Sequence, residues 1–404
     1  MRLSEIYPEE GQVQRIYCDR CGQHTILSYT TFDETIEDVH IIIKDLPVLV
    51  CVRCKTRYLP NRSRGAIIYA FEQATKNKQG TVKITRKTTT ENFGFTCVPF
   101  IYDSDDYYYI PGLIREHDPG YLTPVFFNSE VLLKFDNSPE YRITFASKTY
   151  GDIRRSDDYS IPFGINQNRK VIMWLGDVAT LPTNEQYYLR SENVESDHMI
   201  GSEFYDGQIE CIFTDLSPED ELMKARSEFH EYAFKTFGRR LTHLDTETLS
   251  LIEQLKPPVV QTEKEIRHIL DLLNKINVES LNVGVIGELL QERGVAQEKL
   301  GSLKKLQKLY EFEYPSRNIS NAISPLFILY DLRVGYSHLT SKRKRDEVLA
   351  SACERLGLKA GATGFDEIYT RLVASLTQCY SQLTEINERE CNSGFGKSLH
   401  QTWF

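Results

Sequence analysis

The sequence predicts a multidomain α+β protein. Three observations support this prediction. Two CxxC pairs lie in the first 60 residues, short apolar runs broken by turn residues fill residues 61–215, and long amphipathic helical patterns follow from residue 216. A length of 404 residues suits several domains at about 100–200 residues each. We therefore expect three domains, at 1–60, 61–215 and 216–404.

Composition excludes some classes of protein. With 41% hydrophobic and 26% charged residues, the chain as a whole is not intrinsically disordered. Its apolar runs fall far short of the roughly 20 residues of a membrane-spanning helix, and its N-terminus has no apolar signal segment, so we expect a cytoplasmic protein with no membrane partner. The net charge of -9 argues against a general nucleic-acid coat but leaves room for a local basic groove.

The cysteines at the N-terminus favour a metal site. Cys18 and Cys21 form one CxxC pair, and Cys51 and Cys54 form the second. Four sulfurs supplied by two such turns are the tetrahedral ligand set of a closed structural Zn²⁺ site, which leaves no open position for catalysis. Four unrelated buried cysteines are the weaker interpretation, and a redox role lacks a βαβ context.

The insert between the two pairs, HTILSYTTFDETIEDVHIIIKDLPVLV, alternates and is rich in β-formers, which predicts a strand pair. With its flanking cysteines it resembles the zinc finger of MqsA-type antitoxins. The matching positions are Cys18, Cys21, Gly22, Pro47, Cys51 and Cys54. Those antitoxins continue into a helix-turn-helix. No such motif follows here, so DNA binding is not carried over.

The middle domain is expected to consist of strands and turns, as in VLLKFDNSPEYRITF. Near its end, Asp197, His198 and Glu203 offer oxygen and imidazole ligands for Mg²⁺ or Mn²⁺. Their spacing fits no established ligand motif, which favours a polar loop leading into an edge strand. A metal-dependent nuclease or hydrolase in this region is the third of three functional hypotheses.

The C-terminal domain is predicted to be all-α. Ser217 is a capping residue, Pro218 suits the first helical position, and a helical pattern then runs to Gly238. Apolar faces spaced for helices recur further along, as in a helical bundle. We expect these helices near 246–256, 262–276, 283–293, 298–312, 319–338, 342–356 and 365–388.

Arg333 and His338 are the candidate catalytic residues. They lie five positions apart, about 140° around a helix, and share a face only if the helix bends or ends nearby. Histidine transfers protons near neutral pH, and a guanidinium binds phosphate. A basic run that suits RNA phosphates follows: Lys342, Arg343, Lys344 and Arg345. The alternatives are a capped or core histidine and a solvated helix start.

The stretch DLRVGYSHL in a helical domain resembles the HEPN superfamily, whose active members carry R-x4-6-H. The resemblance implies a metal-independent endoribonuclease with Arg333 and His338 as its catalytic pair. It also implies a homodimer that acts on RNA in anti-phage defence or toxin–antitoxin growth arrest, with an antitoxin or a phage-derived trigger protein as partner. Val334 departs from the polar residue that usually follows the arginine.

Two hypotheses follow for the C-terminal domain. In the first, His338 is a general acid/base, Arg333 stabilises the phosphorane, and the finger and middle domain sense a trigger. In the second, the helical domain is a catalytically inactive RNA- or protein-binding module, and the zinc finger is its docking surface. Cleavage of RNA by the wild type but not by His338→Ala distinguishes the two.

Overall fold

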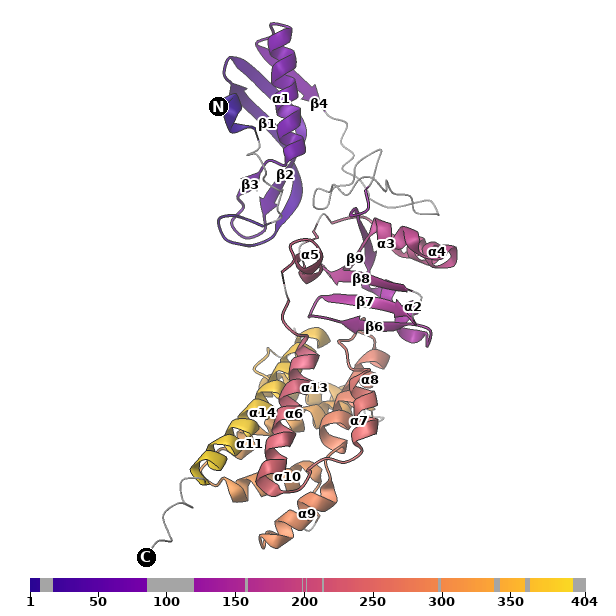
Figure 1. The fold of residues 1–404 in the computed structure, drawn as a ribbon, viewed down its shortest axis with the longest axis vertical. Helices are drawn as coiled ribbons and strands as arrows, with labels where there is room; N and C mark the ends of the chain where they lie inside the picture. Colours follow the sequence, from indigo (N-terminus) through magenta and orange to yellow (C-terminus); the bar gives the residue numbers. More distant parts are fainter. Residues whose placement is uncertain are drawn as a thin grey trace, which may run out of the picture. The chain divides into compact units, whose positions relative to one another are not determined.

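The computed structural model describes most of the chain, in two compact units that divide between Asp215 and Leu216. The described residues are 1–7, 17–85, 120–156, 159–197, 199–200, 202–212, 214–296, 299–337, 342–359 and 364–394, without the side chains of 61, 62, 342 and 387–394. The fold is mixed α+β, with sheets in the first unit and helices in the second (Figure 1). None of the described helices has the length and apolar character needed to cross a membrane.

A long β-hairpin dominates the start of the first unit. Strands β1 (Thr25–Ile36) and β2 (Val39–Cys51) pair antiparallel, with a register shift between Thr30 and Phe32. The predicted strand pair between the cysteine turns is therefore confirmed. Short strand β3 (Arg57–Tyr58) adds antiparallel to β2 just after the second cysteine turn, and a 3-10 turn, η1 (Leu3–Glu5), precedes the hairpin.

Residues beyond 60 complete this sheet. Helix α1 (Asn61–Lys76) lies along the hairpin in Figure 1, and β4 (Thr81–Thr85) pairs parallel with β2. Ile67, Ala70 and Ala74 of α1 pack on the apolar face that alternation along the hairpin creates. The sheet therefore continues past the domain boundary expected at residue 60, because α1 packs on one face of the hairpin and β4 adds a strand beside β2.

A second sheet follows in the first unit, with strand order β10-β5-β9-β8-β7-β6 and antiparallel neighbours throughout. Its strands are β5 (Pro124–Asn128), β6 (Arg142–Phe145), β7 (Tyr150–Arg155), β8 (Tyr159–Ile165), β9 (Lys170–Trp174) and β10 (Asn193–Val194). The helical segments around it are η2 (Ser129–Val131), α2 (Leu132–Asn137), α3 (Leu175–Thr180), α4 (Thr183–Glu192) and α5 (Glu203–Gln208). The prediction of strands and turns holds for the sheet but misses α1 and α4.

Helices joined by turns and short loops make up the described residues of the second unit, with one isolated β-bridge between Thr242 and Leu281. Its helices are α6 (Pro218–Phe237), α7 (Asp245–Ile252), α8 (Glu263–Asn274), α9 (Val283–Glu292), α10 (Ser302–Glu313), α11 (Ile319–Ala322), α12 (Ser324–Ser337), α13 (Lys342–Arg355) and α14 (Phe365–Gly394). A π-helical turn, η3 (Lys275–Glu279), extends α8. The positions of these helices agree with the helical patterns in the sequence.

Local signals and burial together explain this bundle. The Ser217 hydroxyl accepts a hydrogen bond from the backbone N–H of Asp220, and α6 ends at Gly238, whose φ is +66°. One apolar core joins the helices, and within it the Phe229 ring contacts the rings of Tyr310 and Tyr380, with centroids 5.9 and 5.3 Å away. The core lies between residues 222 and 383, so its apolar contacts come from within this unit.

Candidate metal centre

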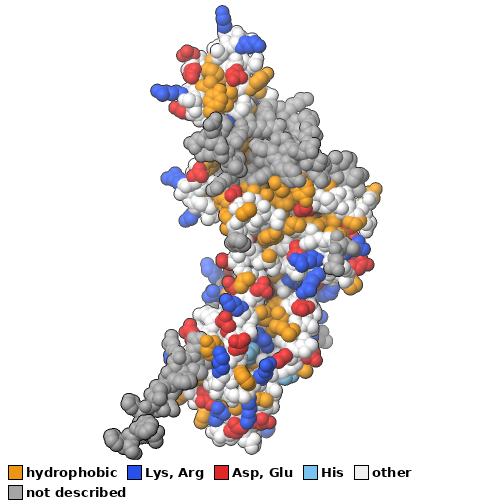
Figure 2. Space-filling view, in the orientation of Figure 1, with side chains coloured by type: hydrophobic (Ala, Val, Ile, Leu, Met, Phe, Trp, Pro, Cys, Tyr) orange, Lys and Arg blue, Asp and Glu red, His pale blue; other side chains and the backbone are white. Residues whose placement is uncertain are grey.

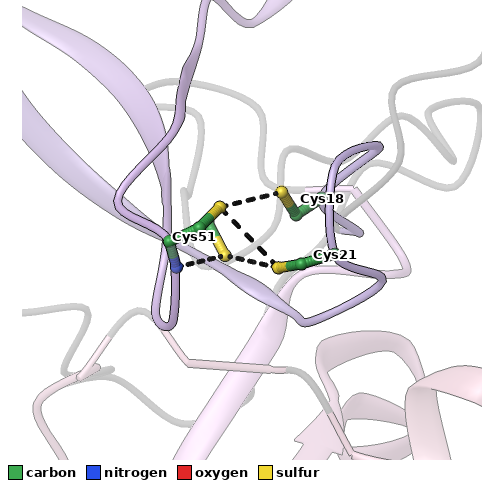
Figure 3. A group of neighbouring side chains, drawn as sticks. Cys18, Cys21 and Cys51 are labelled. Carbon is green, nitrogen blue, oxygen red and sulfur yellow. Dashed lines mark hydrogen bonds between the residues drawn. The ribbon is translucent and has the colours of Figure 1, made fainter.

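The four cysteine sulfurs converge on one point between the hairpin end and the preceding turn (Figure 3). All four Sγ atoms lie within 4.8 Å of one another, and the Cys18–Cys54, Cys21–Cys51 and Cys21–Cys54 distances are 3.4, 3.5 and 3.7 Å. Disulfide sulfurs lie about 2.0 Å apart, so these cysteines are not bonded in pairs. Sulfurs that bind one Zn²⁺ tetrahedrally at about 2.3 Å lie about 3.8 Å apart, close to these distances.

The two cysteine turns have the same backbone structure. In the first, the N–H of Cys18 donates to the carbonyl of Gln23, and the N–H of Gly22 donates back to the carbonyl of Cys18. In the second turn, the N–H of Cys51 donates to the carbonyl of Thr56, and the N–H of Lys55 donates back to the carbonyl of Cys51. The residue after each pair has a left-handed φ, +68° at Gly22 and +60° at Lys55. Each turn thereby points both of its sulfurs to the same side.

Hydroxyl groups and backbone amides surround the sulfurs. Tyr58 of β3 lies 3.1 Å from Cys18 Sγ through its hydroxyl, and the Thr56 hydroxyl lies 3.1 Å from Cys54 Sγ. The N–H of Cys54 donates to Cys51 Sγ at 3.4 Å. Hydrogen bonds to sulfur stabilise the thiolate, which is the form that binds a metal. Tyr58 and Thr56 do not stand out in the sequence, because neither lies in a ligand position of the CxxC motif.

These contacts give the thiols different acidities. Hydrogen bonds from Thr56 lower the pKa of Cys54 to about 6, and the Tyr58 hydroxyl lowers the pKa of Cys18. A hydrogen bond with the backbone of Gln23 also lowers the pKa of Cys21. Burial and the neighbouring thiols outweigh this effect and raise the pKa of Cys21 to about 11. A divalent cation bound among these sulfurs would displace the remaining protons, so binding would release protons and strengthen as the pH rises.

The donor set fits a closed metal site. Cys18 and Cys51 are buried, and Cys21 and Cys54 are half-buried. Four thiolates around a divalent cation carry a net charge of about -2. Arg20 and Arg53, both exposed, lie inside the two CxxC turns and supply nearby positive charge. The four cysteines can therefore bind a metal ion, and with all positions filled by sulfur the centre offers no site for a reacting water.

Arg333 lies four residues before the end of α12, in the helical unit. Its guanidinium is a quarter exposed, 3.5 Å from an Asp271 oxygen and 3.7 Å from a Glu279 oxygen. These distances exceed those of hydrogen bonds, and the Arg333 Nε–H has no hydrogen-bond partner. Burial would raise the pKa of Asp271, but Lys275 and Arg333 outweigh it and lower it. Two carboxylates thus hold this arginine electrostatically.

His338 lies outside the described residues, directly after α12 ends at Ser337. In the basic run, the Lys342 side chain also lies outside them, and Lys344 is exposed. Arg343 forms an exposed ion pair with Glu347 at 3.0 Å. Arg345 pairs with Glu263 of α8 at 3.0 Å and lies 5.9 Å from the Tyr336 ring. Carboxylates in the same unit therefore contact part of the basic run.

The carboxylates of the middle region are already bound by protein groups. Asp197 accepts hydrogen bonds from the side chains of Asn166 and Asn168 and from the backbone of Met199. Glu203 accepts three, at 2.7–2.8 Å, from residues 147 and 149. His198 is not among the described residues. Both acids thus hold loops in place, and the one metal-ligand cluster in the part of the chain that the structure describes is the cysteine site.

Comparison with protein families, curated proteins and solved structures finds no match to this chain.

Proposed function

We propose that this protein is a metal-independent endoribonuclease of HEPN type whose catalytic residues are Arg333 and His338. The observation that carries the proposal is the partly exposed guanidinium of Arg333 near the C-terminal end of α12, which two carboxylates hold at 3.5 and 3.7 Å, five residues before a histidine. A guanidinium with unused donors can bind a phosphate oxygen. A histidine just beyond the same helix end supplies the proton transfer that phosphodiester cleavage requires.

The proposed reaction uses the RNA itself as nucleophile. The ribose 2′-hydroxyl loses its proton to a base and attacks the adjacent phosphorus. The bond to the 5′-oxygen of the next nucleotide breaks as that oxygen takes up a proton. The products are a 2′,3′-cyclic phosphate and a free 5′-hydroxyl. His338 transfers the proton, and Arg333 stabilises the negative charge that develops on the phosphorane oxygens.

Charged side chains at the end of α12 support an RNA-binding role. Arg267 of α8 donates from Nε to the carbonyl of Tyr336 at 3.1 Å, and Arg345 of α13 reaches the same Tyr336 through its ring. Arg267 and Arg345 share the carboxylate of Glu263. Cations from α8 and α13 therefore meet at Tyr336, two residues before His338.

The basic run would extend this contact along the RNA backbone. Lys342, Arg343, Lys344 and Arg345 lie at the first positions of α13. Phosphate contacts of this kind weaken as salt concentration rises. We further propose that two protomers pair so that both Arg–His sets face one cleft, and that the first unit binds an antitoxin or a phage-derived trigger protein.

RNA cleavage tests the proposal. Purified full-length protein is incubated with a mixed-sequence RNA at low concentrations of EDTA, next to Arg333→Ala and His338→Ala. Both variants are expected to lose at least about 100-fold in cleavage rate, because each removes a group that acts in the transition state. Arg355→Ala is the matched control. Arg355 forms an ion pair between α13 and Asp331 of α12 and lies outside the proposed site.

A second candidate is a catalytically inactive module that binds RNA or protein. The observation that favours it is the pairing of cations with acids: Asp271 and Glu279 face Arg333, and Glu263 faces Arg345. Basic and acidic side chains also alternate over the visible face of the helices (Figure 2). Absence of cleavage by the wild type and all variants supports this candidate and contradicts the endoribonuclease.

For the first unit we propose a zinc ribbon with a structural Zn²⁺. Sulfur-only ligation and distances near those of a tetrahedral site support zinc. Elemental analysis of the purified protein is expected to find about one Zn²⁺ per chain, and Cys51→Ser is expected to lose it. Cys211→Ser changes an exposed cysteine away from the cluster and should retain the metal. Iron in place of zinc, or full zinc in Cys51→Ser, would contradict the assignment.

A further inference from the structure

One face of helix α6 lines a cavity of about 370 Å³ within the helical unit. Arg226 and His230 are four residues apart on α6 and so lie on the same face of the helix. Helix α7 and residues 240–242 form the opposite wall. This volume lies in the range of small-molecule sites in proteins. In the sequence, Arg226 and His230 are separated by three residues. This spacing does not match the R-x4-6-H motif of the HEPN superfamily.

Arg226 is a buried cation that lacks a carboxylate partner among the described residues. It is 9% exposed, and its Nη2 donates to the Ser280 hydroxyl at 3.0 Å. Its Nε–H has no hydrogen-bond partner. Burying a guanidinium without a counter-charge costs several kcal/mol in general. A bound anion in the cavity would supply the missing charge.

His230 lines the same wall of the cavity. Its Nδ1 atom is buried and has no hydrogen-bond partner. Burial, and to a lesser degree the charge of Arg226, hold the pKa of His230 well below its usual range. The ring is therefore neutral near pH 7 and carries one N–H, which can donate to an anion without adding a second buried charge.

The rest of the lining divides into a polar part and an apolar mouth. Thr242 and the buried Thr248 also line the cavity. At the surface, Phe234 is 48% and Leu249 is 61% exposed. The charged groups at the rim are Arg240, Asp245 and Glu231, and the first two form an ion pair at 2.9 Å. Positive charge thus lies at the base of the cavity, and apolar surface lies at its opening.

The geometry points to a binding site for an organic phosphate of about mononucleotide size. The phosphate lies toward Arg226, His230 and the two threonines, and the organic part covers Phe234 and Leu249. A guanidinium, an imidazole and two hydroxyls offer more donors than the two oxygens of a carboxylate require, which favours phosphate. This site is separate from the proposed RNase residues and does not depend on them.

Calorimetric titration of the full-length protein tests the site. The probes are adenosine 5′-monophosphate, inorganic phosphate and benzoate. The nucleotide is expected to bind at one site per chain, inorganic phosphate more weakly, and benzoate not at all. Arg226→Lys keeps the positive charge but loses the paired N–H donors of the guanidinium. It is expected to weaken nucleotide binding by at least about tenfold. Circular dichroism checks that each variant is folded.

Two further variants control for folding. Leu249→Glu places a negative charge at an exposed position of the mouth, where it should not disturb the core, and is expected to weaken binding by at least about threefold. Arg239→Gln removes an arginine outside the lining, paired with Glu288 and Glu292, and should leave binding unchanged.

The proposal is overturned if the wild type does not bind the nucleotide. Benzoate binding as tightly as the nucleotide, or unchanged affinity in both Arg226→Lys and Leu249→Glu, overturns it equally. Weaker binding in either folded variant supports it.

Discussion

Gly22 and Lys55 occupy equivalent positions after the two CxxC turns, yet one is glycine and the other is not. Both have a left-handed φ, +68° and +60°. Glycine adopts this conformation without strain, whereas a residue with a Cβ atom costs roughly 1–2 kcal/mol. Lys55 therefore stores strain that the hydrogen bond from its N–H to the Cys51 carbonyl, at 3.2 Å, helps to offset.

Gly22→Ala tests this conformational argument. No atom lies within 4 Å of a Cβ at this position, so the substitution adds backbone strain without a steric clash. We expect the free energy of unfolding of the first unit to fall by about 1 kcal/mol, measured by urea denaturation of the metal-loaded protein. Gly80→Ala is the matched control, because Gly80 also has open space and lacks a left-handed φ. An equal loss in both variants would contradict the argument.

Helix α6 shows how one element carries several separate tasks. Its first turn holds the Ser217 cap, and its buried face packs Phe229 and Ala233 into the core. The same face presents Arg226 to the cavity, where Arg226 binds Ser280. Ser280 directly follows Glu279 of the π-helical turn η3, which lies 3.7 Å from Arg333. Two adjacent residues therefore contact the two arginines: Ser280 binds Arg226, and Glu279 lies near the proposed catalytic Arg333.

Glu219 in the first turn of α6 makes stability depend on pH. Burial raises the pKa of Glu219 above its ordinary value of 4.5, and the hydrogen bond from the Tyr369 hydroxyl at 2.6 Å only partly opposes this. Because the folded state holds this proton more tightly, the free energy of unfolding falls as the pH rises from the ordinary pKa through the raised one. Glu219→Gln cannot ionise, so it is expected to become more stable than the wild type above that window.

Urea denaturation at pH 4 and pH 8 measures the difference. The stability of Glu219→Gln relative to the wild type should rise between the two values. Glu221→Gln removes a charge from an exposed position of the same turn and controls for the helix dipole. A constant difference between Glu219→Gln and the wild type across this range would refute the argument.

The molecule as a whole divides into two units with different sources of stability. In the helical unit the described core runs from residue 222 to residue 383 and comes from its own helices. In the first unit, the ends of β2 and β3 meet at a four-cysteine centre, where a bound metal would cross-link segments far apart in the sequence.

Chelation should therefore act on one unit alone. Scanning calorimetry of the full chain is expected to show two transitions. Excess EDTA should lower the one that belongs to the first unit by about 10 °C or more, because structural metal sites contribute strongly to folding. The second transition should stay in place and match that of residues 216–404 prepared alone. A shift of both transitions by the same amount would contradict independent units.

The sequence alone determined several features of this protein because they depend on local physics. The spacing of residues was enough to predict the four-cysteine cluster, the hairpin between the two cysteine pairs and the helices after Ser217. The signals for these features are ligand turns, alternation and helix capping, and each acts over a few residues. The R-x4-H spacing also identified Arg333, but it could not predict that Asp271 and Glu279 lie beside this arginine. The packing of α1 on the hairpin and the pairing of β4 with β2 were missed, because both depend on contacts between distant segments.

Only the tertiary structure decided which charges are paired and which are not. Asp197 and Glu203, metal-ligand candidates by composition, are bound by side chains from other strands and loops. Arg226 looks like any helix-surface arginine in the sequence, and folding buries it at a cavity without a carboxylate partner among the described residues. Burial and charge pairing depend on residues brought together from distant parts of the chain. The spacing of residues along the chain therefore does not predict them.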